Sequence, residues 1–589
     1  MIGRQFTWFG VLGMCALCAG GLAWAETSAE KPGPTVEALV RDLQNELPQV
    51  RIAAADALGR LGAEARSAVP ALLAAAKGEQ AWVDTAMLNA ISALGAAALP
   101  ALLDIFQNGD DALRLRAGRA LWGLDALAPE TLPIFKKALE DKDPKIKNMA
   151  ERIVKKIEAE NTASSAAAVK PAVPVAATPR TAAAAPAASR DWPQFHGPNR
   201  DSLCTETGLL SAWPDGGPQL LWKIEDAGRG LSTVSIAGGK LFTTGDRKRE
   251  AQYVICYDLS SRKELWATRM GPPYKDYGAQ CTPTVDGSAV YALGTEGDLV
   301  CLEAGTGAIS WQKNLPKDFG GKMMNMWKFS ESPLVDGEKL ICTPGAQDAG
   351  LVALDKKTGA LIWKCALPEL GERGKDGAGY SSAVVAEIEG VRQYVQVLGR
   401  GVVGVAADSG KFLWGYNRLA SEVANITHPL VRGNLVFTTN AYYTGSALLQ
   451  IRRAGEAFKA EEVYFLPHKQ FQNHHGGVVL LGDYVYGGSG QNKGDPACIN
   501  FASGEVAWKA QTPSGGSAAV LYADGHLLFR YDRGLVVLVA ADPKAFRIEA
   551  RFTPPTADGP AWAHPVIHDK KLYLRHNDLL LCYDLSARN

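Results

Sequence analysis

The sequence predicts a multidomain protein of α and β type, with an N-terminal α-solenoid followed by a C-terminal eight-bladed all-β propeller. Three observations favour this fold class. Helical apolar patterns recur between residues 35 and 160, tryptophans recur after residue 190, and the two ends of that second region each supply part of one repeat unit. A chain of 589 residues is also too long for one ordinary domain, so several domains are expected.

The composition narrows the class of function. The chain carries 62 basic and 62 acidic residues, so its formal net charge is zero. Neither nucleic acid nor an anionic membrane would attract it through a general charge effect. Hydrophobic residues at 47% and charged residues at 21% are typical of folded globular proteins and exclude disorder throughout the chain.

Residues 1–25 are predicted to be a signal peptide. Arg4 supplies a positive start, residues 6–22 are mostly apolar, and residues 23–25 (Ala-Trp-Ala) form a small-x-small cleavage site. An uncleaved membrane anchor is the alternative. No later stretch reaches the roughly 20 apolar residues that a spanning helix needs. We therefore expect export to the periplasm or cell envelope, with no transmembrane span after the signal is cleaved.

Residues 26–160 are predicted to form helix pairs of a solenoid. Segments such as VRIAAADALGRLG and LRLRAGRALWGLD share one apolar pattern. Its apolar residues recur at intervals of 33, 30 and 33, at Leu61, Leu94, Leu124 and Ile157. Such a period is typical of repeats in which each helix pair buries its apolar face against the next pair.

Prolines and charges refine this assignment. Pro70, Pro100 and Pro133 are expected near helix starts, where the missing N–H group costs nothing. The segment resembles HEAT repeats, with PQVRIAAADALGRLG as the best match. Its 17 basic and 20 acidic residues provide no basic groove for nucleic acid. Both a spacer module and a protein-binding surface remain open as its role.

Residues 161–189 are predicted to be a disordered linker. They are rich in Ala, Pro and Thr, show no periodicity and contain almost no large apolar side chain. Such a stretch buries too little surface to offset the entropy lost on ordering. It would therefore tether the helical repeats to the rest of the chain.

Residues 190–589 contain a β-type repeat. Each unit ends in a hairpin such as LVALDKKTGALIW, in which turn residues and a glycine precede a tryptophan. We expect the tryptophans to dock structurally on the neighbouring blade. They stand at gaps of 44, 45, 52, 51 and 94, in the positions Trp222, Trp266, Trp311, Trp363, Trp414 and Trp508. The last gap contains a skipped unit, in which Val463 is expected at the tryptophan position.

The number of blades follows from the ends of this region. LLLCYDLSARN at the C-terminus is a third strand with no hairpin partner after it, and PQLLWKIE around Trp222 is a tryptophan strand with no partner before it. Joined, they complete one blade and remove the open edges that promote aggregation. The region then contains eight units of about 50 residues, which predicts an eight-bladed propeller.

Eight cysteines follow the signal peptide. Cys256, Cys301 and Cys582 occupy the place in the repeat at which Ala353 stands in LVALD. A position that accepts either Ala or Cys is a small buried core site, so we expect mostly free thiols rather than disulfides.

The hairpin signature ALDxxTGxxxW, seen as ALDKKTGALIW and CLEAGTGAISW, resembles the pyrroloquinoline-quinone (PQQ) repeat. The stretch DWPQFHGPNRDS, followed by AWPDGGPQLLWKI, is similar to the opening of exported PQQ-like propeller proteins. The resemblance covers about two-thirds of the chain and implies the propeller fold. It implies no single activity, because the repeat builds both quinoprotein alcohol dehydrogenases and the non-catalytic propeller lipoprotein of the outer-membrane β-barrel assembly machinery.

The dehydrogenase branch implies features that this sequence lacks. Its members place adjacent cysteines beside the quinone, and no two cysteines here are adjacent. They also hold calcium with Glu, Asn and Asp and stack a Trp from a long insertion, for which units of about 50 residues leave little room. The one CxxC, at Cys15 and Cys18, is followed by Ala19 rather than a haem-binding His. No catalytic residue, metal ligand or cofactor is therefore expected. PQQ and calcium belong to the alternative of an alcohol or sugar dehydrogenase.

Polar and aromatic residues are predicted to line the rim of the central channel. Aligned units place a small hydroxyl residue, such as Thr233 or Thr282, just before each innermost strand, where it would bond the backbone. His428 and His564 depart from this pattern. The predicted rim residues are Trp327, Glu331, Tyr380, Asn425, His428, His474, His475, Trp562 and His564. They would bind a sugar, a peptide or a metal, or they are solvated loop residues and satisfied histidines.

One main functional hypothesis and two alternatives follow. The main hypothesis is an exported, non-catalytic scaffold for protein–protein interaction in the cell envelope, because two repeat modules on one tether can engage a single assembly together. The alternatives are a PQQ- and calcium-dependent dehydrogenase and a carbohydrate-binding propeller. An envelope protein is the expected partner, and nucleic acid is not.

Overall fold

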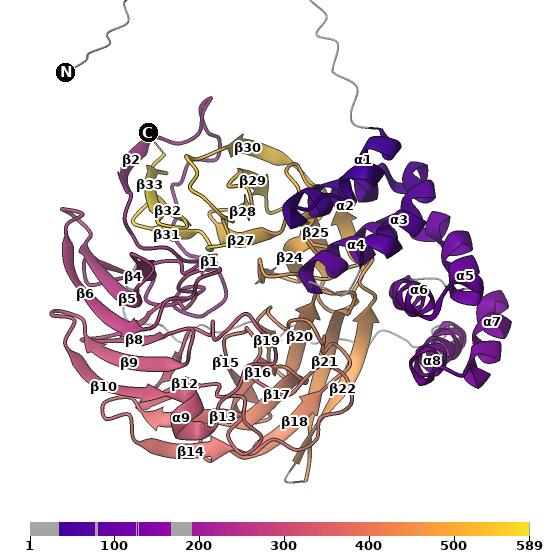
Figure 1. The fold of residues 1–589 in the computed structure, drawn as a ribbon. Coiled ribbons are helices and arrows are strands. Elements are labelled where there is room, and N and C mark those ends of the chain that lie inside the picture. Colours follow the sequence, from indigo (N-terminus) through magenta and orange to yellow (C-terminus); the bar gives the residue numbers. More distant parts are fainter. Residues whose placement is uncertain are drawn as a thin grey trace, which may run out of the picture. The chain divides into compact units, whose positions relative to one another are not determined.

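The computed structural model describes residues 35–76, 81–124, 127, 129–166, 191–455 and 457–587. The predicted signal peptide, and the predicted linker from residue 167 onward, lie outside these residues. The chain divides into two compact units, Met1–Lys170 and Pro171–Asn589 (Figure 1). The described part of the first unit is helical, and the regular secondary structure of the second is almost entirely β-strand, joined by turns and loops.

The first unit is built of short helices. The α-helices are α1 (Val36–Asp42), α2 (Pro48–Leu61), α3 (Val69–Ala75), α4 (Ala81–Ala93), α5 (Leu99–Asn108), α6 (Asp111–Gly123), α7 (Leu132–Lys137) and α8 (Pro144–Ala166). Between them lie the 3₁₀ helices η1 (Gly62–Ala68), η2 (Gly95–Ala98), η3 (Pro129–Thr131) and η4 (Ala138–Glu140).

These helices pack as a solenoid of HEAT type. Helix α2 packs on α4, α4 on α6 and α6 on α8, while α3 of one pair also meets α5 of the next. Pro70, Pro100 and Pro133 occupy the first or second position of α3, α5 and α7, which confirms their predicted place at helix starts. Leu94 and Ile157, two residues of the predicted period, are buried in one continuous core.

Helix α8 continues beyond the predicted start of the linker. Residues 161–166 extend it to Ala166, whereas the sequence places the boundary after residue 160. Alanine has the highest helix propensity, and no proline occurs before Pro171, so nothing in this stretch stops the helix locally.

The second unit is a propeller of eight antiparallel blades in the described residues, which confirms the predicted fold class (Figure 1). From the innermost strand outward, blade 1 contains β3 (Ser235–Ala237), β4 (Lys240–Arg247), β5 (Ala251–Asp258) and β6 (Glu264–Gly271), and blade 2 contains β7 (Thr284–Asp286), β8 (Ala289–Leu293), β9 (Asp298–Glu303) and β10 (Ile309–Asn314). Blade 3 contains β11 (Leu334–Asp336), β12 (Lys339–Cys342), β13 (Leu351–Asp355) and β14 (Leu361–Cys365), and blade 4 contains β15 (Val384–Ile388), β16 (Val391–Leu398), β17 (Gly401–Ala406) and β18 (Phe412–Tyr416).

The remaining blades follow the same order. Blade 5 contains β19 (Leu430–Arg432), β20 (Leu435–Asn440), β21 (Gly445–Ala454) and β22 (Ala457–Leu466), and blade 6 contains β23 (Val478–Leu481), β24 (Tyr484–Ser489), β25 (Asp495–Asn500) and β26 (Val506–Lys509). Blade 7 contains β27 (Ala518–Ala523), β28 (His526–Tyr531), β29 (Val536–Ala540) and β30 (Ile548–Phe552). Blade 8 contains β31 (Val566–His568), β32 (Lys571–His576), β33 (Leu579–Asp584) and β2 (Leu220–Ile224). Strand β1 (Leu203–Cys204) and the short helix α9 (Leu315–Phe319) lie outside this pattern.

Blade 8 closes the ring as the sequence predicts. Its outermost strand β2 comes from the start of the propeller and pairs antiparallel with β33 near the C-terminus, with Trp222 opposite Cys582. Each end of the propeller thereby covers a strand edge that the other would leave open.

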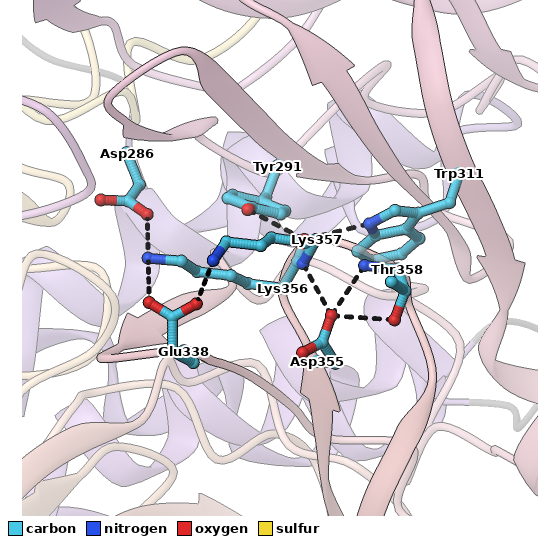
Figure 2. A network of polar contacts seen from close by, with 8 residues as sticks. All are labelled: Asp286, Tyr291, Trp311, Glu338, Asp355, Lys356, Lys357 and Thr358. Carbon is cyan, nitrogen blue, oxygen red and sulfur yellow. Dashed lines mark hydrogen bonds and ion pairs between the residues drawn. The ribbon is translucent and has the colours of Figure 1, made fainter.

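Successive blades are joined by a repeated contact at the hairpin corner (Figure 2). Between blades 2 and 3, the indole N–H of Trp311 and the hydroxyl of Tyr291 both donate to the carbonyl of Lys356, each at 3.0 Å. The preceding Asp355 carboxylate accepts from the backbone N–H and the hydroxyl of Thr358, each at 2.8 Å. The turn is thus held by its own aspartate, and it presents its carbonyl to the neighbouring blade.

Three other docking tryptophans make the same kind of hydrogen bond, and two make a different contact. The indole N–H groups donate to a backbone carbonyl of the next blade in the pairs Trp266–Ala304, Trp363–Ala407 and Trp508–Asp542. Trp414 instead donates to the side-chain oxygen of Gln393 at 2.8 Å, and the ring of Trp222 lies 5.9 Å from that of Tyr573.

In blade 5, Tyr464 rather than Val463 takes the tryptophan position. Tyr464 is paired with Leu448 at the register that the tryptophans occupy elsewhere, and its hydroxyl donates to the carbonyl of Phe501 at 3.0 Å. A Cβ at Gly504 would lie 2.9 Å from the tyrosine ring, so the ring covers the next corner closely. The assignment of Val463 is therefore wrong by one residue. Val463 is 37% exposed on the opposite face of the strand.

The eight cysteines of the propeller are all buried and free, which confirms the prediction of free thiols. Burial raises the pKa of Cys256 and of Cys582 to about 12, so these thiols stay protonated. None of the helices among the described residues is both long enough and apolar enough to span a membrane.

Candidate binding site at the channel mouth

One end of the central channel is ringed by the residues that immediately precede the innermost strands. The backbone N–H of Thr233 donates to the hydroxyl of Thr282 at 3.1 Å, and that of Thr282 donates to Ser332 at 3.1 Å. The N–H of Ser332 donates in turn to the hydroxyl of Ser382 at 3.0 Å. This ring, which we call the girdle, links blades 1 to 4. It confirms that the small hydroxyls bond the backbone.

In three other blades the girdle position holds no small hydroxyl residue. It is occupied instead by His428, Gly477 and His564. His196 lies against both histidines, with ring centres 4.1 Å and 4.6 Å apart. A Cβ at Gly477 would lie 3.1 Å from Cε1 of His196 and 3.3 Å from Cε1 of His564. Gly477 also has a φ of +71°, so both space and conformation require glycine where the three imidazoles meet.

His196 belongs to segment 191–204, which we call the plug. The plug begins with an antiparallel bridge between Trp192 and Ile236 of blade 1, and it ends with β1 paired in parallel with β27 of blade 7. It therefore crosses the hub of the propeller. Its tip, at His196, reaches the end of the channel at which the innermost strands begin.

Arg200 fixes the middle of the plug. Its guanidinium is buried and donates to backbone carbonyls at the entries of blades 3 and 4 and to one side chain of the plug, namely Ala383 at 3.1 Å, Ser332 at 3.0 Å, Pro333, and the Oε1 of Gln194 at 2.9 Å. Burial lowers the pKa of Arg200 to about 10, so the guanidinium remains charged at neutral pH.

The histidines of the hub are neutral at pH 7. Burial lowers the pKa of His428 to about 3, and His564 and Arg200 nearby add to this effect. Burial likewise lowers the pKa of His474 and of His564 to about 4. The pKa values of His196 and His475 are also shifted well below the ordinary value, again chiefly by burial. An uncharged imidazole offers one N–H donor and one nitrogen acceptor to a ligand.

Partly exposed aromatic side chains continue from these histidines in the loops at the same end of the channel. The ring of Trp562 lies 4.6 Å from that of His475 and 5.5 Å from that of Tyr277. His475 is stacked at 4.3 Å on His474, whose Nε2 lies 2.8 Å from the hydroxyl of Tyr442. These contacts bring together side chains from four different loops.

Two further aromatic residues complete this surface. The ring of Trp327 lies 5.9 Å from that of Tyr380. The pKa of Tyr442 is raised chiefly by its burial and further by the nearby Tyr380 and Tyr277. We call the surface formed by Tyr277, Trp327, Tyr380, Tyr442, His475 and Trp562 the mouth cluster.

Glu331 and Asn425, predicted at the rim, lie in the walls instead. Glu331 is 3% exposed, and its carboxylate accepts from the N–H and hydroxyl of Thr343 and from the amide of Gln396 at 3.1 Å. Burial raises the pKa of Glu331 to about 7. The buried amide of Asn425 donates to the carbonyl of Leu398 at 3.0 Å. Both polar groups are occupied by the protein itself.

The other seven predicted rim residues meet at the mouth or at the histidines below it, whereas several contributors were missed. His196 and Arg200 lie in a stretch whose sequence gives no repeat signal, so the repeat pattern could not identify them. Their backbone φ angles are positive, at 63° and 56°, which is uncommon for residues other than glycine. Tyr277 was detectable, since it stands five residues before Thr282 of the girdle, just as Trp327 stands five before Ser332.

Two polar side chains of the hub offer no free oxygen ligand to the calcium ion of a calcium-bound quinone. Calcium needs several oxygen ligands, yet the centre of the hub holds the cationic Arg200, and the oxygens of Glu331 are bonded to protein donors. No group of three His, Cys, Asp or Glu side chains in the described ranges is arranged to hold a metal ion. The chemistry that these residues offer is stacking and neutral hydrogen bonding.

Comparisons with known proteins agree with the two repeat types. The family model described as outer membrane protein assembly factor BamB matches residues 250–510, and the model described as HEAT repeats matches residues 34–122. A search of curated proteins found no match.

Solved structures show the same kind of similarity at low identity. BamB from Moraxella catarrhalis is 14% identical over 62% of this chain and 99% of its own, with a TM-score of 0.45. The quinohemoprotein alcohol dehydrogenase ADHIIG from Pseudomonas putida HK5 is 15% identical over 68% of this chain and 81% of its own, with a TM-score of 0.47. A europium-containing methanol dehydrogenase is 12% identical over 65% and 89%, with a TM-score of 0.47. The chain thus forms a closed eight-bladed β-propeller after a helical segment, and it is similar to the BamB-type PQQ repeat family over residues 250–510 and to HEAT repeats over residues 34–122.

Proposed function

We propose that the protein is an exported, non-catalytic scaffold that binds other proteins of the cell envelope. The observation that carries this proposal is a repeated set of exposed apolar side chains on the circumference of the propeller. They are 37–48% exposed and lie on the outermost strands β2, β6, β10, β14, β22 and β30, as Leu220, Leu221, Leu265, Ile309, Leu361, Ile362, Val463 and Ile548. A contiguous exposed apolar patch is typical of protein interaction sites, and the adjacent residues on β14 and on β2 come nearest to one.

The position of these side chains favours a partner of extended conformation. The outermost strand of a blade has one edge whose N–H and C=O groups face away from its own sheet. A partner segment can add a strand to such an edge through backbone hydrogen bonds, while apolar side chains beside the edge provide contact area. Blade 3 presents two such residues, Leu361 and Ile362, next to the docking Trp363.

Substitutions on β14 test this proposal. The full-length protein, carrying an affinity tag, is cross-linked in the native cell envelope, and the captured proteins are identified by mass spectrometry. We expect the double variant Leu361→Lys/Ile362→Lys to lose about tenfold of the capture of a specific partner, because it places charge on the contact surface. The matched control Lys313→Leu alters a charged residue of β10 and should retain capture. Equal capture by wild type and the double variant would contradict a role for this edge.

The rival quinoprotein function has a direct test. We expect purified protein given PQQ with Ca²⁺ to show neither a bound-quinone absorbance nor dye reduction with a primary alcohol or glucose, because Arg200 is cationic and the oxygens of Glu331 already accept from protein donors. Alcohol-dependent dye reduction would contradict the scaffold function and would favour a dehydrogenase.

Export is tested by the mature N-terminus. Cleavage after residue 25 would make Glu26 the first residue of the protein recovered from the envelope, because residues 23–25 have the small-x-small pattern that signal peptidases recognise. N-terminal sequencing or intact mass measures this directly. A mass that includes residues 1–25 would favour the uncleaved anchor.

A further inference from the structure

We propose that the mouth cluster binds a neutral saccharide, which stacks on Trp562 and bonds to the imidazoles beneath it. This inference is independent of the scaffold function, since it concerns the channel mouth and not the outermost strands. Three features of the mouth lead to it: aromatic faces, unpartnered imidazole nitrogens and the neutral state of the imidazole and phenol groups.

The aromatic faces come from separate loops and are partly exposed. Trp562 precedes blade 8, Tyr277 precedes blade 2, and Trp327 precedes blade 3. None of these side chains is fully buried, so part of each ring remains available for contact. A pyranose ring presents C–H groups on its faces, and these pack on the electron-rich face of an aromatic ring.

Beneath the rings lie polar atoms with no protein partner. The buried nitrogens Nε2 of His428, Nε2 of His475 and Nδ1 of His564 make no hydrogen bond in the described structure. His428 is only 4% exposed. A buried polar atom without a partner costs roughly 1–3 kcal/mol. These nitrogens are enclosed by the protein, so a ligand hydroxyl would supply the missing bond once the side chains around them turn aside on binding.

The charge state of the groups at the mouth selects the class of ligand. Burial keeps the pKa values of the five hub histidines low and raises those of Tyr380 and Tyr442, so all of these groups are neutral at pH 7. Charged groups beside the mouth include the carboxylate of Asp276, near Tyr277, and the carboxylate of Asp532 with Arg533, near Trp562. Two of these three groups are acidic, which disfavours a carboxylate or phosphate, and Arg200 already donates to protein groups. A metal held by three or more His, Cys, Asp or Glu side chains is disfavoured, because no such group occurs in the described ranges. Hydroxyl groups, which both donate and accept, match neutral imidazoles.

The site has the composition usual for small-molecule recognition, with mostly apolar contact and a few placed polar groups. The girdle and the plug hold those groups from below. Gly477 is the position at which His196, His428 and His564 converge, so the floor of the site depends on segments more than 80 residues apart in the chain.

Calorimetric titration of the full-length protein tests the proposal. The probes are cellotriose, maltotriose and chitotriose, which are neutral, and trigalacturonic acid, which is anionic. We expect at least one neutral trisaccharide to bind and trigalacturonic acid to bind at least about tenfold more weakly. Trp562→Ala should abolish the measured heat, and Trp562→Phe, which retains an aromatic face, should retain part of the affinity.

Two further variants separate binding from folding. His475→Gln removes an unpartnered imidazole without removing an aromatic anchor of indole size, and it should weaken neutral trisaccharide binding about tenfold. Trp122→Ala, a substitution of the same type in the helical unit, should leave binding unchanged. Thermal unfolding confirms that each variant is folded. The proposal is overturned if no neutral probe binds, if the anionic probe binds best, or if Trp562→Ala and His475→Gln both bind as the wild type does.

Discussion

Replacing Arg200 by methionine is expected to lower the free energy of unfolding of the propeller by about 4 kcal/mol. Methionine has a similar length but no donors, so the buried carbonyls of Ala383 and Ser332 would lose their partners. Glu331 would also lose a nearby positive charge that lowers its pKa against the effect of burial. The change would release the plug from blades 3 and 4 while leaving the blades themselves intact.

Urea unfolding followed by tryptophan fluorescence measures this effect, because most of the tryptophans lie in the propeller. Arg547→Met is the matched control. Arg547 is exposed and paired only with Glu549 on the surface, so its loss should leave the unfolding midpoint unchanged. Equal midpoints for the two variants would show that the plug does not hold the hub. Arg200→Lys should fall between them, since lysine keeps the charge but cannot reach several carbonyls at once.

The propeller fold was predictable because each hairpin corner is a local structure with a local signature. Asp355, Thr358 and the glycine that follows close the turn within a few residues, and Trp311 meets that turn one repeat away. The regular spacing of the tryptophans in the sequence therefore corresponds to a corner contact that is repeated from blade to blade. The prediction failed at Tyr464, because the docking residue there is not a tryptophan and the alignment had no anchor within the skipped unit.

The candidate site was predictable only in part, for a related physical reason. His428 and His564 stand at a repeated position, so their departure from the hydroxyl pattern is visible in the sequence. Arg200 contacts Ala383, which lies 183 residues away, and nothing periodic connects the two. Glu331 was placed at the rim by its neighbours, yet its carboxylate turns into the wall because Thr343 and Gln396 supply donors there. Side-chain direction at such positions depends on the neighbouring blade.

Acidification from pH 7 to pH 5 is expected to destabilise the propeller by several kcal/mol. The five hub histidines are neutral when folded but have an ordinary pKa of 6.5 when exposed, so below that pH the unfolded chain binds more protons. Each such histidine costs about 2 kcal/mol of stability at pH 5. Carboxyl groups oppose this trend, since burial raises the pKa of Glu331 to about 7 and those of Asp246 and Asp532 to about 6. Three carboxyls offset only part of the effect of five histidines.

Two neutral variants are expected to change the loss of stability on acidification in opposite directions, and so separate the effect of the histidines from that of the carboxyl groups. His428→Gln removes one group that takes up a proton only on unfolding, so stability should fall less between pH 7 and pH 5 than in the wild type. Glu331→Gln removes a group that takes up its proton while folded, so stability should fall more steeply over the same range. Urea midpoints at pH 7, 6 and 5 provide the comparison. If all three proteins lost stability equally, the charge state of the hub would not control acid unfolding, and titration elsewhere in the chain would have to account for it.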